Sequence, residues 1–199
     1  KERYLQNFAK SSGLDMLLSP GTRLGLLGRN GCGKSTLMEL LAASTDNQEK
    51  TPDQGTIKTA DDVRIVSFDQ RREQLDQSLS LKRALAPDGD SIVFQGRSIH
   101  VVSWAKRFLF KPDQLEMPVS RLSGGEQARI LIAQLVRQPA DILLLDEPTN
   151  DLDINSLDVL EESLQEFGGA LVLVSHDRFL LDRVCDLVLG FDGEGGVDY

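Results

Sequence analysis

Residues 28–35 carry the most specific chemical pattern of the sequence. They read GRNGCGKS and fit G-x-x-x-x-G-K-[ST], a loop that binds phosphate groups. Its glycines allow backbone angles that point successive N–H groups at phosphate oxygens, and the helix that follows adds the positive end of its dipole. Lys34 would place a charge near the β- and γ-phosphates of a nucleotide, and Ser35 would offer a hydroxyl to Mg²⁺.

An ordinary glycine-rich turn is the alternative interpretation of this loop. An apolar strand pattern precedes the loop and a helical pattern follows it, which is the context that phosphate binding requires. The sequence therefore predicts a nucleotide site. The residues expected to line it are Gly28, Arg29, Asn30, Gly31, Cys32, Gly33, Lys34, Ser35 and Thr36.

Two adjacent acids, Asp146 and Glu147, follow the apolar run 142–145. A buried strand would deliver both to the carboxyl edge of a parallel sheet, where such folds bind ligands. Because side chains alternate along a strand, the two acids cannot share one role. We expect Asp146 to hold Mg²⁺ and Glu147 to act as the general base on an attacking water. A charged strand end before a turn is the alternative, and the phosphate loop upstream argues against it.

Residues 122–127 read LSGGEQ and open a predicted helix. Ser123 as N-cap and Glu126 three positions later form a capping box. A capping box does not explain Gly124 and Gly125, because glycine in a first helical turn costs stability. Two glycines there leave bare amides at the positive end of a helix, which predicts a second anion site.

The elements that must position these motifs alternate between strand and helix. Strands are expected at 3–8, 22–27, 57–58, 63–68, 142–145, 170–174 and 187–191, and helices at about 34–43, 79–86, 98–110, 123–137, 154–167 and 177–184. Apolar strands separated by helices are typical of a parallel sheet covered on both faces. We therefore predict an α/β fold with a mostly parallel sheet. A small helical subdomain at about 76–137 would be packed by Val101, Trp104, Phe108 and Phe110.

The composition is that of a soluble globular domain. The chain has 199 residues, of which 40% are hydrophobic and 27% charged, and it contains no apolar run of membrane-spanning length. Two cysteines, Cys32 and Cys185, are too few for a disulfide framework, which favours a reducing, cytoplasmic setting. The net charge of −9 disfavours direct nucleic-acid binding, because an acidic surface gains little from phosphate backbones.

Five motifs follow one another along the chain: the phosphate loop, Gln70 after a strand, LSGGEQ, LLLLDEP and Ser-His-Asp at 175–177. In this combination the sequence resembles ATP-binding-cassette (ABC) domains over nearly its whole length. The resemblance implies an ABC-type P-loop ATPase domain that hydrolyses Mg-ATP. It also implies a partner, a second ABC domain arranged head to tail. The LSGGEQ helix of each domain would close over the γ-phosphate of the other domain's ATP.

The resemblance assigns further roles. Gln70 would contact Mg²⁺ and the attacking water, so that the metal set becomes Ser35, Gln70 and Asp146. His176 would bind the γ-phosphate beside the catalytic Glu147, and residues 150–153 would cross the interface between the two domains. The residues that contact the partner's ATP would be Ser123, Gly124, Gly125 and Gln127.

The segment EPTNDLD at 147–153 resembles the ABC-F family, whose members carry two cassettes on one chain and no membrane domain. Residues 96–110 are similar to the second cassette of its Uup-like members. The resemblance implies that residues 1–199 form a single ABC domain of a longer, cytoplasmic protein. That protein would work on the ribosome or another nucleic-acid assembly, without membrane insertion. Ser12 stands where such cassettes often carry an aromatic residue that stacks on adenine.

Three other functions fit the motifs less well. The main alternative is the ATPase subunit of a membrane transporter, but many transporter cassettes have small residues where this chain has Asn150 and Asp151. A chromosome-maintenance ATPase would need a very long helical insertion between Lys34 and Ser123, which are too close for it. A nucleotide-gated binding module with little turnover would not need Glu147.

Overall fold

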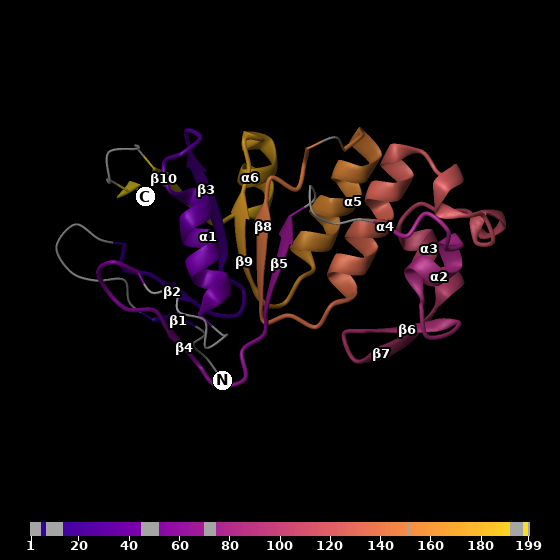
Figure 1. Ribbon diagram of the computed structural model, residues 1–199, viewed down its shortest axis with the longest axis horizontal. Helices are drawn as coiled ribbons and strands as arrows, with labels where there is room; N and C mark the ends of the chain where they lie inside the picture. The colour runs from indigo at the N-terminus through magenta and orange to yellow at the C-terminus, as the bar shows by residue number, and fades with distance from the viewer. Residues whose placement is uncertain are drawn as a thin grey trace. The chain divides into compact units, whose positions relative to one another are not determined.

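The computed structural model describes residues 5–6, 14–44, 52–69, 75–150, 152–191 and 197–198 (Figure 1). The chain forms two compact units. The first contains Lys1–Asp69, Pro139–Thr149 and Gln165–Tyr199, and the second contains Gln70–Gln138 and Asn150–Leu164. The phosphate loop and the two adjacent acids belong to the first unit, whereas LSGGEQ belongs to the second.

The first unit is built on a sheet with the strand order β11-β10-β3-β9-β8-β5. The strands β10, β3, β9, β8 and β5 run parallel to one another, and β11 pairs antiparallel with β10. All of β9 and the first four residues of β8 are buried, as expected for strands covered on both faces. The strands are β3 (Arg23–Gly28), β5 (Ile65–Asp69), β8 (Ile142–Asp146), β9 (Ala170–Val174), β10 (Leu187–Phe191) and β11 (Val197–Asp198), and the helices of this unit are α1 (Lys34–Ala43) and α6 (Arg178–Val184).

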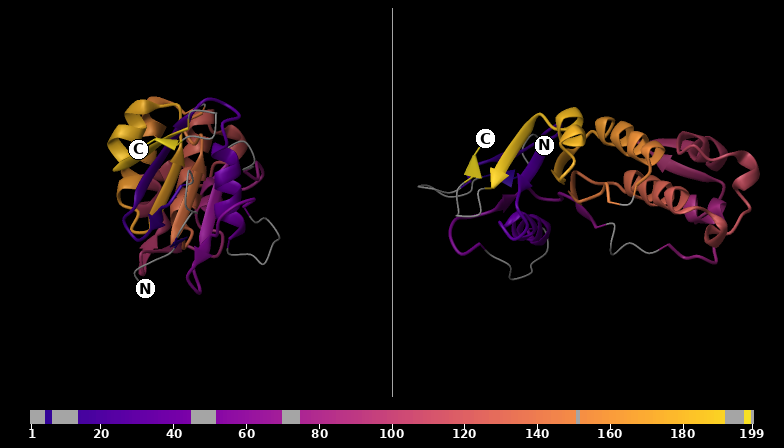
Figure 2. Two further views of the ribbon diagram at one scale, coloured as in Figure 1. Left: turned by 90° about the vertical axis from the view of Figure 1, so that its left-hand side faces the viewer. Right: turned by 90° about the horizontal axis from the view of Figure 1, so that it is seen from above.

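Helices α1 and α6 cover opposite faces of this sheet, as the left view of Figure 2 shows. On one face, Leu41 of α1 packs in a core with Leu24 and Leu26 of β3. Gly25 points to the other face, where a Cβ would come within 2.9 Å of Leu181 in α6. This alternation along β3 follows from the strand period of two. The predicted fold class, a parallel sheet with helices on both faces, is confirmed.

A smaller antiparallel sheet with the order β2-β1-β4 belongs to the same unit. Its strands are β1 (Leu5–Gln6), β2 (Leu17–Leu18) and β4 (Lys58–Thr59). Leu18 is fully buried in the core that α1 forms with the parallel sheet. The small sheet is therefore anchored to the main core through β2.

The second unit is mostly helical. Trp104 and Phe108 are fully buried with their ring centroids 4.9 Å apart, and Val101 and Phe110 are buried as well. Their helical spacing predicts this packing. The elements are α2 (Leu81–Leu85), β6 (Ser91–Phe94), β7 (Arg97–His100), α3 (Val101–Arg107), the 3-10 helices η1 (Pro112–Gln114) and η2 (Val119–Arg121), α4 (Gly124–Arg137) and most of α5 (Ile154–Gln165).

The structure corrects the sequence prediction between residues 91 and 100. The predicted helix over 98–110 begins only at Val101, because the residues before it form β7, which pairs with β6 in a hairpin. Gln95 and Gly96 form the turn with φ angles of 49° and 74°, the positive values of a type I′ turn. His100 then ends the strand and caps α3, since its Nδ1 accepts the Val102 N–H at 3.3 Å.

Candidate active site

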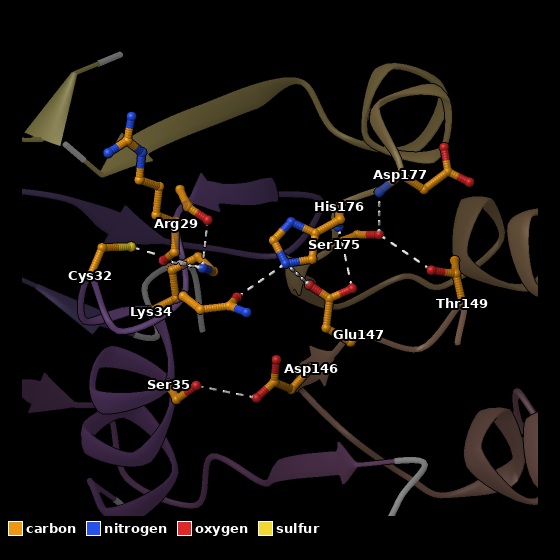
Figure 3. A network of polar contacts seen from close by, with 12 residues as sticks. Arg29, Cys32, Lys34, Ser35, Asp146, Glu147, Thr149, Ser175, His176 and Asp177 are labelled. Atoms are coloured by element: carbon orange, nitrogen blue, oxygen red, sulfur yellow. Dashed lines mark hydrogen bonds and ion pairs between the residues drawn. The ribbon is translucent and has the colours of Figure 1, made fainter. Parts of the chain in front are cut away.

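The predicted phosphate loop connects β3 to α1 (Figure 3). Gly31 and Gly33 have φ angles of 82° and 105°, in the left-handed region that glycine adopts without strain. Gly33 is also the N-cap of α1, where no side chain of the described residues caps the helix. The first amides of α1 are therefore left for an anion, as the motif requires.

Lys34 is held by its own loop. Its Nζ donates to the carbonyl oxygens of Gly28 at 2.8 Å and Arg29 at 3.0 Å, and lies 3.8 Å from Sγ of Cys32. The residue is only 7% exposed, so the ammonium stays within the loop. A positive charge fixed in this way is suited to phosphate oxygens.

Ser35 and Asp146 come together from distant parts of the sequence. Ser35 Oγ donates to Asp146 Oδ2 at 3.5 Å (Figure 3). A hydroxyl and a carboxylate are hard oxygen ligands, and Mg²⁺ at phosphate sites commonly uses one or two protein ligands together with phosphate and water. The pair therefore fits Mg²⁺ bound with a nucleotide. Gln70, the third predicted metal ligand, lies outside the described residues.

Glu147 takes a backbone conformation that separates it from Asp146. Its φ is 49°, in the left-handed region that is uncommon for residues other than glycine. The Glu147 N–H donates to the Val174 carbonyl at 2.9 Å, which ties this conformation to β9. The carboxylate reaches His176, whose backbone N–H donates to Oε2 at 3.3 Å. Asp146 thus faces Ser35 and Glu147 faces His176, so the two acids have different neighbours.

One carboxylate oxygen of Glu147 has an unusual environment. Oε1 is buried and has no hydrogen bond to the described residues. His176 Nε2 lies 3.4 Å away, within ion-pair distance, but it is not aligned for a hydrogen bond. A buried acceptor without a partner costs free energy, so this oxygen is suited to a water or ligand atom that enters the site.

Hydrogen bonds hold the residues on both sides of His176, although the His176 side chain is 58% exposed. Ser175 before it is buried, and its hydroxyl lies 3.4 Å from Thr149 Oγ1 and accepts the Asp177 N–H at 3.0 Å. Asp177 after it caps α6, because its Oδ1 accepts the Phe179 N–H at 2.9 Å. An exposed imidazole on a fixed main chain can meet a ligand without reordering the loop.

In the second unit, the capping box predicted for LSGGEQ is present. Ser123 Oγ accepts the Glu126 N–H at 3.3 Å, and Glu126 Oε2 accepts the Ser123 N–H at 2.8 Å. Desolvation raises the pKa of Glu126, but hydrogen bonds from Ser123 and Gln114 outweigh it and keep this pKa below its usual value. The helix therefore begins with an ionised carboxylate that supports its N-terminus.

The two glycines of LSGGEQ have different surroundings. A Cβ on Gly124 would meet no described atom within 4 Å, whereas a Cβ on Gly125 would overlap the carboxylate of Asp153. Ser156 binds both residues of this contact. Its Oγ donates to the Gly125 carbonyl at 3.0 Å, and its N–H donates to Asp153 Oδ1 at 2.8 Å. Close packing against Asp153 therefore explains the glycine at position 125, and the sequence did not indicate this contact. Gly124, in contrast, leaves the N-terminus of the helix open to approach.

Some predicted site positions lie outside the described residues. These are Gln70, Asp151 and Ser12. The structure also reveals a neighbour of His176 that the motifs did not suggest, the side chain of Asn30, whose Oδ1 is 3.3 Å from Nε2. The two residues are 146 positions apart, so no local pattern could indicate this contact.

Comparisons with known proteins define the class of the chain. Residues 11–150 match the family model described as ABC transporter. The chain therefore belongs to the ABC transporter family and carries the ATPase domain of that family. A solved structure described as a dimeric post-hydrolysis state of the ATP-binding cassette MJ0796, bound to ADP and Pi, shares the fold. Its TM-score is 0.65 at 18% identity, covering 100% of this chain and 94% of that one.

Curated relatives refine this class. The chain is 43% identical over 178 residues to the ATP-binding protein Uup of Caulobacter vibrioides, covering 89% of this chain and 28% of that protein. It is 34% identical over 202 residues to the energy-dependent translational throttle protein EttA of Haemophilus influenzae, covering 98% of this chain and 35% of that protein. The predicted resemblance to Uup-like ABC-F cassettes is confirmed. The chain spans about a third of the length of these relatives. No helix in its described part is both long and apolar enough to cross a membrane.

Alkylation of Cys32 gives a chemical test of the loop. Burial raises the pKa of Cys185 to about 12, with Asp186 adding to the rise, so Cys185 stays a poorly reactive neutral thiol. We expect a thiol-alkylating reagent near neutral pH to modify Cys32 first and to block ATP binding, because the added group would crowd Lys34. ATP should protect the thiol, and Cys32→Ser should remove the sensitivity. Mass spectrometry with a nucleotide-binding assay measures both effects; labelled Cys32 with intact binding would contradict the expectation.

Proposed function

We propose that this chain binds Mg-ATP and hydrolyses it as one half of a head-to-tail pair of ABC domains. The observation that carries the proposal is the meeting of four groups in the first unit: the phosphate loop, Asp146, Glu147 and His176. Ser35 contacts Asp146, and Glu147 contacts His176, as described above. The groups that would bind phosphate and Mg²⁺, the proposed general base and the proposed phosphate-binding histidine therefore belong to one unit.

The chain's own residues would act by position and charge. Lys34 and the backbone amides from Gly28 to Thr36 would hold the phosphates. Ser35, Asp146 and Gln70 would hold Mg²⁺, which neutralises charge on the β- and γ-phosphates. Glu147 would polarise the attacking water and His176 would donate to a γ-phosphate oxygen. The buried, unbonded Oε1 of Glu147 supports this role for the base.

The second half of the site would come from a partner domain. Ser123, Gly124, Gly125 and Gln127 of one domain would contact the γ-phosphate held by the other. The open space at Gly124 supports this arrangement, because backbone amides at a helix N-terminus attract anions and a side chain there would block the approach. The dimeric state named for the MJ0796 structure is consistent with it.

We further propose that ATP turnover drives work on the ribosome or another nucleic-acid assembly. The relative EttA is named a translational throttle. The family description favours one alternative, the ATPase subunit of a membrane transporter. The cytoplasmic location stays a prediction.

Sedimentation with ribosomes tests this biological role. The Glu147→Gln variant, which should bind ATP without hydrolysing it, is expected to sediment with ribosomes only when ATP is present. Lys34→Ala is the matched control, because it should fail to hold ATP and therefore stay in the supernatant. If Glu147→Gln binds ATP but never sediments with ribosomes, the ribosome is excluded, and another nucleic-acid assembly or a transporter partner remains.

A further inference from the structure

The side chain of Asn30 links the phosphate loop to His176. Its Oδ1 lies 3.3 Å from His176 Nε2 in hydrogen-bond geometry. The same nitrogen is 3.4 Å from Glu147 Oε1, and yet that oxygen makes no hydrogen bond to the described residues. The ring nitrogen is therefore directed to a neutral amide although a carboxylate lies almost as near.

The neighbours of Nε2 indicate that this nitrogen carries the proton. An amide oxygen and a carboxylate oxygen are both acceptors, so a protonated Nε2 satisfies its surroundings. The reverse assignment would turn the Asn30 NH₂ group to an unprotonated Nε2. It would then bring the lone pair of Nε2 close to Glu147 Oε1, which is repulsive. The Nε2–H form is also the one that can donate to a γ-phosphate.

We propose that Asn30 is a positioning residue that holds His176 ready for the γ-phosphate and keeps its N–H away from the base, Glu147. Without Asn30, the N–H would turn to Glu147 Oε1 and form a charge-assisted hydrogen bond, which is stronger than one to a neutral amide. ATP would then have to break that bond to reach His176. With Asn30 in place, a charged γ-phosphate oxygen readily displaces the amide oxygen, and Oε1 stays open for water. The inference rests on the proposed function.

Nucleotide binding tests the γ-phosphate part of this proposal. ADP and the β,γ-imido analogue of ATP differ at the γ-phosphate, so their dissociation constants separate an effect on His176 from an effect on the loop. We expect Asn30→Ala to weaken binding of the analogue about two- to tenfold, the size of one hydrogen bond, and to weaken ADP binding much less. In a His176→Ala background the Asn30→Ala change should add little, because the two residues act as a pair.

Two outcomes of this cycle would overturn the proposal. Equal losses for ADP and the analogue would make Asn30 a purely structural residue of the loop. Losses that add fully between Asn30→Ala and His176→Ala would show that the residues act independently. If the parent chain bound neither nucleotide, the proposed ATPase function itself would fail, and that result is distinct from both.

Proton NMR tests the geometry without any nucleotide. The chain has two histidines, so His100, which caps α3, serves as the internal reference for His176. His176 faces the carboxylate of Glu147 and is followed in the chain by Asp177. We expect Asn30→Ala to shift the ring-proton signals of His176, because its N–H gains a carboxylate partner, and to leave those of His100 unchanged. Glu147→Gln added to it should reverse the shift. Unchanged signals of His176 in Asn30→Ala would overturn the proposal.

Discussion

Glu147→Gln should reduce ATP hydrolysis by about 10²- to 10⁴-fold, the usual contribution of a general base, and leave ATP binding intact. Glutamine has the same shape and retains an acceptor for the His176 backbone N–H, which Oε2 accepts at 3.3 Å in the parent chain. It cannot take a proton from water. Because the bound ATP is then not consumed, the variant should also accumulate as a closed dimer.

Steady-state phosphate release and analytical ultracentrifugation with and without ATP measure these two effects. Glu116→Gln makes the same chemical change at an exposed acid of the second unit and is the matched control. A Glu147→Gln variant that hydrolyses ATP at the parent rate would remove Glu147 as the base. One that binds ATP but stays monomeric would contradict the proposed closed pair.

Gly125→Ala should destabilise the fold by up to about 1 kcal/mol, because the half-exposed Asp153 carboxylate must move aside, and Gly124→Ala should not. A Cβ on Gly125 overlaps the Asp153 carboxylate, which Ser156 and the first turn of α5 hold in place. A Cβ on Gly124 meets open space, and alanine is a better helix former than glycine. The same overlap should displace Asp153 and the neighbouring residues of the proposed interface, so hydrolysis should fall as well.

Denaturant unfolding of the two variants measures this difference in the free energy of unfolding. Asp153→Ala removes the carboxylate that the new Cβ would meet, so its combination with Gly125→Ala should be less destabilised than the sum of the two single variants. Equal stability of Gly124→Ala and Gly125→Ala would show that the contact with Asp153 does not constrain the signature turn.

The central parts of the fold could be predicted because their signals are local and continuous. The buried run at 170–174 becomes β9 without a change in its bounds, and α1 occupies 34–43 as its apolar register predicts. The capping box of Ser123 and Glu126 is likewise a short-range pattern that the structure reproduces. In each of these segments a single local preference agrees with the tertiary environment.

The parts that could not be predicted depend on competing local signals or on contacts between residues that are distant in the sequence. Residues 97–100 have no strong strand signal of their own, and the helical pattern that continues from Val101 masked the hairpin. The contact between Gly125 and Asp153 joins two separate motifs, and the contact between Asn30 and His176 spans most of the sequence. Each motif is a local pattern and carries no information on contacts with another motif, so these contacts appear only in the folded chain.

A mixture of two inactive variants tests whether two domains share each ATP. Lys34→Ala should hold no ATP but present an intact LSGGEQ helix. Gly124→Asp should hold ATP but carry a negative charge where the partner's γ-phosphate must approach, and the open space around Gly124 should let its own fold accommodate the change. If two domains share each ATP, the mixture should regain hydrolysis that neither variant has alone, because one complete site forms in each mixed pair. A mixture as inactive as its components, with both variants folded, would contradict the shared site.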